Sequence, residues 1–249
     1  AVTMRAIRDH LASSRPASET SRPARVIDIG GGPGRYSLEL SRLGHEVTLL
    51  DLSPANVERA REVTGGRLAG YHCGTATDLS AFRDSSFDCA LLLGPLYHLL
   101  EESERRRAVA EAVRVLVPGG LLFASFITVF APIRDMAKNY PEAGLKFAAT
   151  PEELARWVRD GRWVAGEGSA FTDAWFAHPA EVVPFMEGAA DLESLSLLAA
   201  EGVVSMIEEK VNRLEGPLWD YWAEVNYRLA ADPSLLGGAE HLLYVGRKR

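Results

Sequence analysis

A cluster of glycines flanked by two carboxylates has the spacing in this chain that is best suited to chemistry. Gly30, Gly32 and Gly34 alternate along the chain. Asp28 precedes the first of them by two positions, and Asp51 ends the next apolar stretch. Glycines let a backbone approach a ligand to a distance at which a Cβ would collide. A carboxylate beside the turn would repel a pyrophosphate but suits an ammonium group, and one after the following strand can accept from ribose hydroxyls.

A strand, a turn and a helix must position these residues. Residues 26–29 predict a short buried strand, because β-branched side chains fill it and the glycines end it. Residues 35–43 predict a helix whose positive end faces the turn, and residues 45–51 predict a second buried strand. Nicotinamide and flavin sites instead require G-x-G-x-x-G, and Arg35 stands where their third glycine would be. The spacing therefore counts against a dinucleotide.

The run D-x-G-x-G-x-G resembles the first motif of the class I methyltransferases, which bind S-adenosylmethionine. Further pieces extend the resemblance over residues 22–128, including the phrase R-V-L-V-P-G-G-L-L-F-A-S-F. It implies that Thr77-Asp78-Leu79 lines the adenine, with the carboxylate accepting from the exocyclic amine and the next backbone N–H reaching the ring. The cofactor-binding residues that it implies are Asp28, Gly30, Gly32, Gly34, Tyr36, Asp51, Leu52, Thr77, Asp78, Leu79 and Leu93.

The resemblance also implies the fold. We expect an α/β, Rossmann-like sheet of seven mostly parallel strands in the order 3-2-1-4-5-7-6, with the last strand antiparallel and helices on both faces. Later strands are predicted at residues 87–93, 121–127, 192–198 and 241–247. Later helices are predicted at residues 101–116, 133–138, 151–159, 203–214 and 217–229, with another starting at His178-Pro179. The chain is expected to form one domain over 1–249, with a helix and linker (1–21), a cofactor-binding half (22–128), a lid insertion (129–175) and a remaining core (176–249) that contains a helical insertion (203–231).

Composition limits the partners. The 249 residues carry a net charge of −7, and no basic run is longer than Arg105-Arg106-Arg107, which argues against a nucleic-acid acceptor. No apolar stretch approaches the roughly 20 residues of a membrane span. The two cysteines predict buried thiols in a reducing compartment. We expect a cytoplasmic protein with a small-molecule acceptor and no membrane partner, and a homodimer stays open.

Three side chains are candidates for catalysis. Tyr97 and His98 follow the fourth strand, at the edge of the sheet where chemistry occurs in open α/β folds, and His178 is a second candidate base. Each has a structural alternative, since a histidine can pack at a helix start or in a turn. The other histidines, His10, His45, His72 and His241, have no partner pattern and are expected to be surface or packing residues.

No metal site is predicted, because no carboxylates or Cys/His pairs stand at the spacing that a hard cation or zinc requires. All five tryptophans lie in the second half of the chain and predict both a small lid core and an apolar or aromatic acceptor pocket.

The expected function is methyl transfer from S-adenosylmethionine to an N, O or C atom of a small apolar or aromatic molecule. The reaction would be an in-line displacement that releases S-adenosylhomocysteine, mainly through positioning. The alternatives are a methyltransferase acting on a protein, a peptide or RNA, and a cofactor-binding protein without methyl transfer.

Overall fold

A twisted seven-stranded sheet organises the chain, in a computed structural model that describes residues 2–13, 22–165 and 172–249. The strand order is β3-β2-β1-β4-β5-β9-β8, and only the pairs made by β9 are antiparallel. The strands are β1 (Arg25–Ile29), β2 (Glu46–Asp51), β3 (Gly70–Cys73), β4 (Phe87–Leu92), β5 (Leu116–Ile127), β8 (Leu192–Ala199) and β9 (His241–Lys248). Because β8 and β9 are the sixth and seventh strands of this sheet, the predicted fold and strand order are confirmed.

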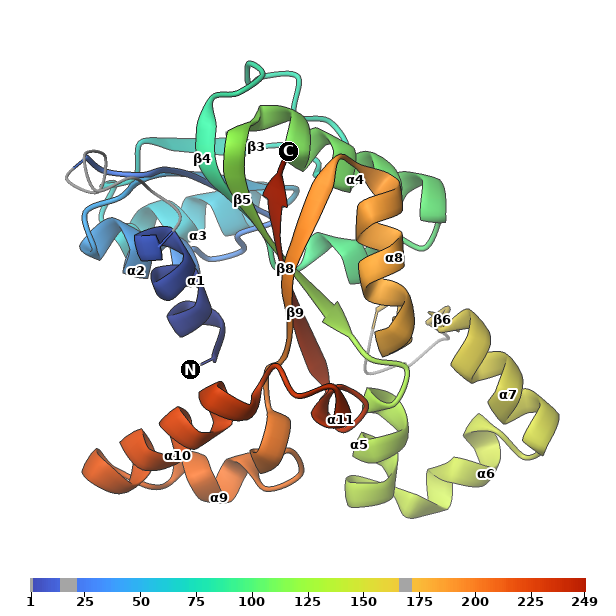
Figure 1. Ribbon diagram of the computed structural model, residues 1–249. Helices are drawn as coiled ribbons and strands as arrows, with labels where there is room; N and C mark the ends of the chain where they lie inside the picture. The colour runs from blue at the N-terminus through green and yellow to red at the C-terminus, as the bar shows by residue number, and fades with distance from the viewer. Residues whose placement is uncertain (1, 14–21, 166–171) are drawn as a thin grey trace.

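Helices cover both faces of the sheet, and Figure 1 shows α1 and α2 on one side of the strands with α8 on the other. One face is packed by α1 (Val2–Ser13), α2 (Arg35–Arg42) and α3 (Pro54–Thr64). The opposite face is packed by α4 (Glu102–Val115) and α8 (Pro179–Ala189). All six residues of β4 are buried, as expected for a parallel strand covered on both faces.

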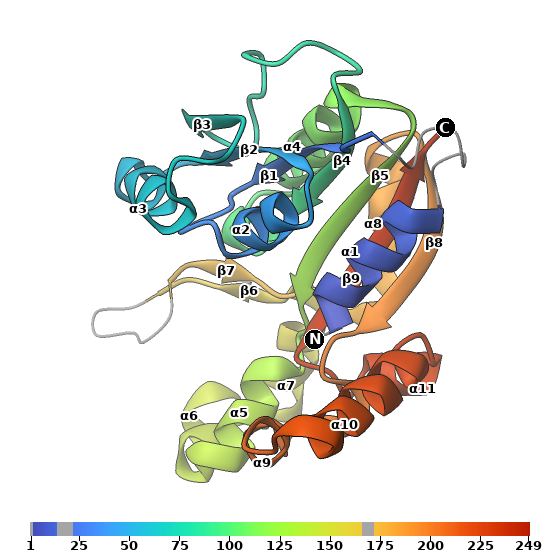
Figure 2. The ribbon, with the colours of Figure 1, turned by 90° about the vertical axis from the view of Figure 1, so that its left-hand side faces the viewer.

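The remaining helices gather beyond the carboxyl ends of the parallel strands, below β5 in Figure 1. One group follows β5 and comprises α5 (Ala131–Asn139), η2 (Pro141–Ala143), α6 (Gly144–Phe147) and α7 (Pro151–Asp160). The other follows β8 and comprises η3 (Gly202–Val204), α9 (Glu208–Asn212), α10 (Gly216–Leu229) and α11 (Pro233–Leu236). Figure 2 shows a two-stranded hairpin, β6 (Arg162–Trp163) with β7 (Ala174–Trp175), between the first group and the sheet.

The structure corrects three details of the predicted elements. Strand β5 begins at Leu116, before the predicted residue 121, because Val-Pro-Gly-Gly forms a bulge inside the strand rather than a separate turn. The helix predicted over residues 203–214 is broken into η3 and α9. The break lies at Met206, whose φ of 74° is left-handed and whose N–H donates to the Glu208 Oε1 at 2.7 Å. The hairpin β6–β7 was not predicted.

Gly161 ends α7 and begins the hairpin under a tight backbone constraint. Its φ is 58°, and a Cβ there would lie 1.9 Å from the carbonyl oxygen of Phe176. The Phe176 N–H in turn donates to the Gly161 carbonyl at 2.7 Å. Only glycine fits this crossing, so it holds the hairpin against the end of α7.

We expect Gly161→Ala to lower the free energy of unfolding by about 2–5 kcal/mol, because left-handed strain and a backbone clash add together. Gly216 is the matched control, with a φ of 56° and no atom within 4 Å of the point where a Cβ would stand. Gly216→Ala should lose only about 1–2 kcal/mol. Urea denaturation of both variants measures the difference, and equal losses would contradict the clash.

Candidate active site

The glycine turn after β1 is tied to the end of β2 by backbone hydrogen bonds. The N–H groups of Gly30 and Gly31 both donate to the Leu50 carbonyl, at 2.7 and 3.2 Å. The next N–H, of Gly32, donates to the Asp51 Oδ2 at 2.8 Å. The turn and the end of β2 therefore form one rigid unit from residues that are far apart in the sequence.

Two glycines of the turn have different reasons to lack a side chain. Gly30 has a φ of 70°, and a Cβ there would lie 2.5 Å from Cγ of Pro95, so the turn packs directly on the segment after β4. Gly32 has a φ of 54° and no atom within 4 Å of where its Cβ would be. The first glycine is needed for packing within the protein, whereas the second leaves open space over the turn.

A cavity of about 520 Å³ lies over this turn. Its size is in the range of small-molecule and cofactor sites. Among the residues predicted from the sequence, those lining it are Asp28, Gly30, Gly32, Tyr36, Asp51, Leu52, Leu93, Tyr97 and His98. Residues that sequence reasoning did not select also line it, among them Arg35, Asn56, Thr75 and Ala76. Four separate strand ends thus converge on one site.

Asp51 is a nearly buried carboxylate, 8% exposed, that already has several partners. Besides the N–H of Gly32, it accepts from the N–H of Ser53 at 2.9 Å and from Nδ2 of Asn56 at 3.0 Å. A carboxylate offers about four acceptor positions, so three of these are used by described residues. The two ribose hydroxyls expected there would compete for the acceptor position of Asp51 that remains. Asn56 gave no signal in the sequence, because its role depends on the helix start at Ser53.

Asp28 is a buried carboxylate in the floor of the cavity, 2% exposed. Burial raises its pKa to about 6, and the hydrogen bond from Ser37 Oγ at 2.6 Å opposes that rise. The nearby Asp51 carboxylate raises the pKa further. A cationic group in the cavity would favour the ionised form of Asp28, so the site is built to gain from binding a positive charge.

The segment after β4 brings the predicted catalytic pair to the same cavity. Tyr97 and His98 lie in η1 (Pro95–His98), with their rings 4.8 Å apart. Burial raises the pKa of the Tyr97 hydroxyl. The exposed His98 has its Nδ1 3.4 Å from the Thr172 hydroxyl. Their roles in the reaction stay predictions, but their placement is the one expected.

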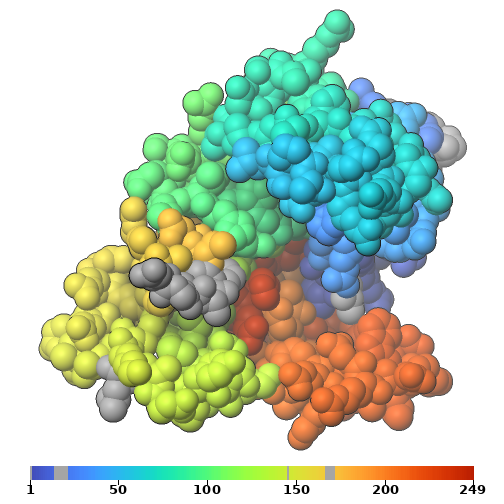
Figure 3. All heavy atoms as spheres, turned by 180° about the vertical axis from the view of Figure 1, so that it is seen from behind, coloured from blue at the N-terminus to red at the C-terminus, as the bar shows by residue number. Residues whose placement is uncertain are grey.

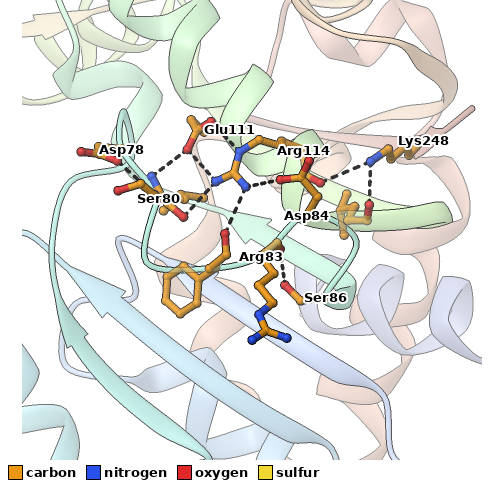
Figure 4. A network of polar contacts seen from close by, with 11 residues as sticks. Asp78, Ser80, Arg83, Asp84, Ser86, Glu111, Arg114 and Lys248 are labelled. Atoms are coloured by element: carbon orange, nitrogen blue, oxygen red, sulfur yellow. Dashed lines mark hydrogen bonds and ion pairs between the residues drawn. The ribbon is translucent and has the colours of Figure 1, made fainter.

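The segment predicted to line the adenine lies outside the cavity lining, which is formed instead by Gly74, Thr75 and Ala76. Figure 4 shows why its polar groups are occupied. The N–H of Leu79 donates to Glu111 Oε2 at 2.8 Å, and the exposed Asp78 accepts from the N–H of Ser80 at 3.0 Å.

Thr77 completes this predicted segment, and its hydroxyl lies 3.0 Å from that of Thr75. It therefore supports a wall residue rather than forming the wall. The predicted contacts of Thr77, Asp78 and Leu79 with the adenine find no support in this geometry. Gly74 and Thr75, which precede this segment in the sequence, line the cavity.

Two further predicted residues also lie outside the cavity lining. Gly34 has a φ of 83°, caps the start of α2 and packs 3.2 Å from Ala60 at its Cβ position. His178 caps α8, where its Nδ1 accepts from the N–H of Ala180 at 3.3 Å and its ring lies edge-on to Phe130. The placement of both residues supports structural roles.

Within residues 2–13, 22–165 and 172–249, no group of three or more His, Cys, Asp or Glu side chains could hold a metal ion. None of the helices described in this structure is long and apolar enough to cross a membrane. The two cysteines are free thiols; Cys89 is buried as expected, whereas Cys73 is exposed, so the expectation of a buried thiol was wrong for Cys73.

Comparison with known proteins identifies the domain. Residues 27–124 match a family model described as a methyltransferase domain. The ubiquinone biosynthesis O-methyltransferase of Xanthomonas euvesicatoria pv. vesicatoria (strain 85-10) is 33% identical over 149 residues, which cover 55% of this chain and 61% of that protein. The chain thus matches less than two thirds of this relative's length. Residues 27–124 are thus similar to a methyltransferase domain, and the strand order is the one expected from the resemblance to the class I S-adenosylmethionine-dependent methyltransferases.

Solved structures share the fold of this methyltransferase domain well beyond the matched segment. A methyltransferase from Methanosarcina mazei superposes with a TM-score of 0.58 at 20% identity, over 93% of this chain and 95% of that one. The 1,6-didemethyltoxoflavin-N1-methyltransferase of Burkholderia thailandensis, crystallised with its substrate and S-adenosylhomocysteine, has a TM-score of 0.51 at 17% identity, over 99% and 82%. At these identities the likeness shows the fold alone.

The buried Asp28 of the methyltransferase domain predicts a pH-dependent stability. Its pKa is about 6 in the folded chain against 3.8 as the ordinary value, so folding favours the protonated form. Wild-type stability should fall as the pH rises from about 4 to about 6, by about 3 kcal/mol in total. Asp28→Asn should lack this loss and be the more stable protein at neutral pH. Denaturation from pH 4 to 8 measures it, and parallel curves for the two proteins would contradict the assignment.

Proposed function

We propose that this protein transfers the methyl group of S-adenosylmethionine to a small apolar or aromatic acceptor. The observation that carries the proposal is the pairing of a buried carboxylate, Asp28, with an open glycine turn held by Asp51. The matched methyltransferase domain and the O-methyltransferase activity of the Xanthomonas relative support it.

The residues present fit this cofactor. Open space over Gly32 admits an atom of a ligand against the backbone, where a side chain would exclude it. The buried carboxylate of Asp28 gains from an adjacent ammonium group, and the remaining acceptor capacity of Asp51 suits a ribose hydroxyl. The exposed Leu52 stands at the rim of the cavity, where it would cover the apolar face of a base.

S-adenosylmethionine supplies, when bound, a methyl group on a positively charged sulfur and is released as S-adenosylhomocysteine. The chain's own residues then have three tasks, which are to hold the cofactor, to align the acceptor and to exclude water. Asp28 would hold the ammonium group of the cofactor and Asp51 a ribose hydroxyl, and the glycine turn shapes the space between these two carboxylates. Tyr97 and His98 form the wall after β4 and position the acceptor.

Small-molecule specificity rests on the helices beyond the sheet edge. Trp157, Phe176 and Ile127 form a small buried cluster there, and Tyr97 packs against it. The cofactor cavity is thus backed by an apolar layer rather than by an open basic groove. Together with the net charge of −7, this favours a small apolar acceptor over a nucleic acid.

Replacing Asp51 tests the cofactor assignment. Asp51→Asn should weaken S-adenosylhomocysteine binding by about 1–3 kcal/mol, because a hydrogen-bonding carboxylate of the site is lost. Asp232→Asn is the matched control, since this aspartate also accepts from the backbone N–H two residues ahead but lies at the start of α11, away from the cavity. Calorimetry measures the affinity of wild type, Asp51→Asn and Asp232→Asn for S-adenosylhomocysteine. Equal affinities for wild type and Asp51→Asn would refute the cofactor assignment.

Methyl-labelled S-adenosylmethionine tests the acceptor class. The protein is incubated with a low-molecular-weight cell extract and, separately, with the macromolecular fraction, with Asp51→Asn as the blank. Label should enter the small-molecule fraction and give a mass to identify. Label in the macromolecular fraction alone would overturn the acceptor class and leave the cofactor assignment standing.

His98→Ala tests the wall after β4. Because the His98 side chain is exposed at the cavity, its removal should lower turnover roughly tenfold while leaving S-adenosylhomocysteine affinity and the melting temperature unchanged. Turnover is measured with the acceptor that the labelling identifies, and thermal unfolding with the apo protein. A fall in melting temperature with full turnover per folded molecule would instead assign His98 to packing.

A further inference from the structure

A second cavity, of about 440 Å³, lies at the ends of β5 and β9. Aromatic residues form much of its wall, among them Phe147, Trp157, Trp163 and Phe176, and Asp135 and Glu240 line it as well. Figure 3 shows the molecule hollowed between the cofactor-binding half and the helices beyond the sheet edge, with atoms from the C-terminal part of the chain, in red, at the floor. Aromatic walls of this kind bind flat apolar rings.

The two cavities meet at Tyr97. This residue lines the cofactor cavity, and it also packs against the apolar cluster that contains Ile127, Trp157 and Phe176. Those three residues line the aromatic cavity. The aromatic cavity is therefore one side chain away from the cofactor cavity, at the edge of the sheet where class I chemistry takes place.

One imidazole at this aromatic cavity is held in a fixed orientation. His241, the first residue of β9, lines the cavity and pairs with Ile127 across the sheet. Its Nδ1 lies 2.8 Å from Oε1 of Glu201. The other carboxylate oxygen of Glu201 accepts from the backbone N–H groups of His241 and Glu240, at 2.9 and 3.2 Å. These three hydrogen bonds fix the carboxylate of Glu201, which in turn fixes the orientation of the His241 ring.

The pairing decides which nitrogen of His241 can act. With Glu201 ionised, Nδ1 carries the proton, so Nε2 is the nitrogen that accepts a proton or a hydrogen bond. No hydrogen bond of Nε2 is found among the described residues, and the side chain is 45% exposed. A purely structural role would explain why Glu201 accepts hydrogen bonds from the backbone. It would give no function to Nε2 of His241.

We propose that the aromatic cavity binds the methyl acceptor as an aromatic molecule with an acidic hydroxyl, and that Nε2 of His241 takes the proton of that hydroxyl while Glu201 positions the ring. The proposal rests on the proposed methyl transfer. In the step assigned to His241, the acceptor O–H bond breaks, the proton goes to Nε2, and the electron pair stays on the oxygen. Glu201 stabilises the resulting imidazolium, which then returns the proton to solvent.

This assignment changes the role expected for His241, which sequence reasoning placed among the packing residues. Its partner, Glu201, stands 40 positions earlier in the chain and is brought to it only by the pairing of β8 with β9. A nitrogen acceptor would gain little from the His241–Glu201 pair, because an amine is a nucleophile as soon as it is neutral. A hydroxyl needs a base to become a nucleophile.

The charges around His241 set the direction of its pH response. The hydrogen bond and charge of Glu201 raise the pKa of His241, and Glu240 adds to the rise. Burial raises the pKa of Glu240, and the negative charges of Glu201, Glu208 and Asp135 raise it further. The one described lysine beside this group, Lys138, is 3.7 Å from Glu208 and is balanced by it. Removing the charge of Glu201 should therefore lower the pKa of His241.

The test uses 4-nitrophenol as probe, since its ring suits the aromatic walls and its anion is coloured. The probe is titrated into wild type, His241→Phe and Glu201→Gln, each saturated with S-adenosylhomocysteine, and absorbance reports the ionisation of its hydroxyl. The imidazole of His241 is followed by NMR against pH in wild type and in Glu201→Gln. His10→Phe is the matched control, because His10 lies on α1 and packs edge-on against Phe123.

Wild type and His10→Phe should bind the probe with a shift toward the anion. His241→Phe should abolish the shift and bind roughly tenfold more weakly, as expected for loss of a hydrogen bond to a charged group. Glu201→Gln should move the imidazole titration, and the pH at which the shift appears, to lower pH.

Equal shifts in wild type and His241→Phe, or no probe binding by wild type, would overturn the proposal. Calorimetry with S-adenosylhomocysteine separates this failure from failure of the proposed function. If the three proteins bind S-adenosylhomocysteine equally and the probe shift is absent, only the acceptor assignment falls. If wild type binds no S-adenosylhomocysteine, the proposed methyl transfer falls with it.

Discussion

The hydrogen bonds between the glycine turn and the end of β2 are the constraint on which the site depends. They join Gly30 and Gly31 to Leu50, and Gly32 to Asp51, so two strand ends become one surface. The same turn leaves no room for side chains where it meets the segment after β4. The cofactor cavity, the start of α2 and the wall that carries the candidate catalytic residues are all positioned by this one crossing.

The buried carboxylate of Asp28 is the feature that supports a binding role for the cavity. Asp28 is held in a place where burial raises the pKa of its carboxyl to about 6, and a single hydroxyl, from Ser37, partly offsets this. A polar but uncharged residue of the same size would fold more easily there. A carboxylate there lowers the stability of the free protein near neutral pH, and it would gain from a positive charge in the cavity.

The helices beyond the sheet edge lie where the proposed acceptor site would be. They come from two separate stretches, one that follows β5 and one that lies between β8 and β9. Aromatic residues of the first stretch line a cavity together with Ile127 of β5 and His241 of β9. Insertions of this kind can vary on a common sheet, so the fold does not by itself fix a substrate.

The sequence by itself determined the class of the protein. The buried strands around the glycine turn follow from local periodicity and from glycine's backbone freedom, whereas the strand order and the cofactor follow from the resemblance of the Asp-x-Gly-x-Gly-x-Gly run to the class I methyltransferases. Side-chain partnerships across the fold were decided only by tertiary structure. The N–H of Leu79 donates to Glu111, and His178 caps α8. His241 pairs with Glu201, which is brought to it by the pairing of β8 with β9. Such contacts join residues tens of positions apart, and no local pattern records which of them the packing of the sheet and helices will bring together.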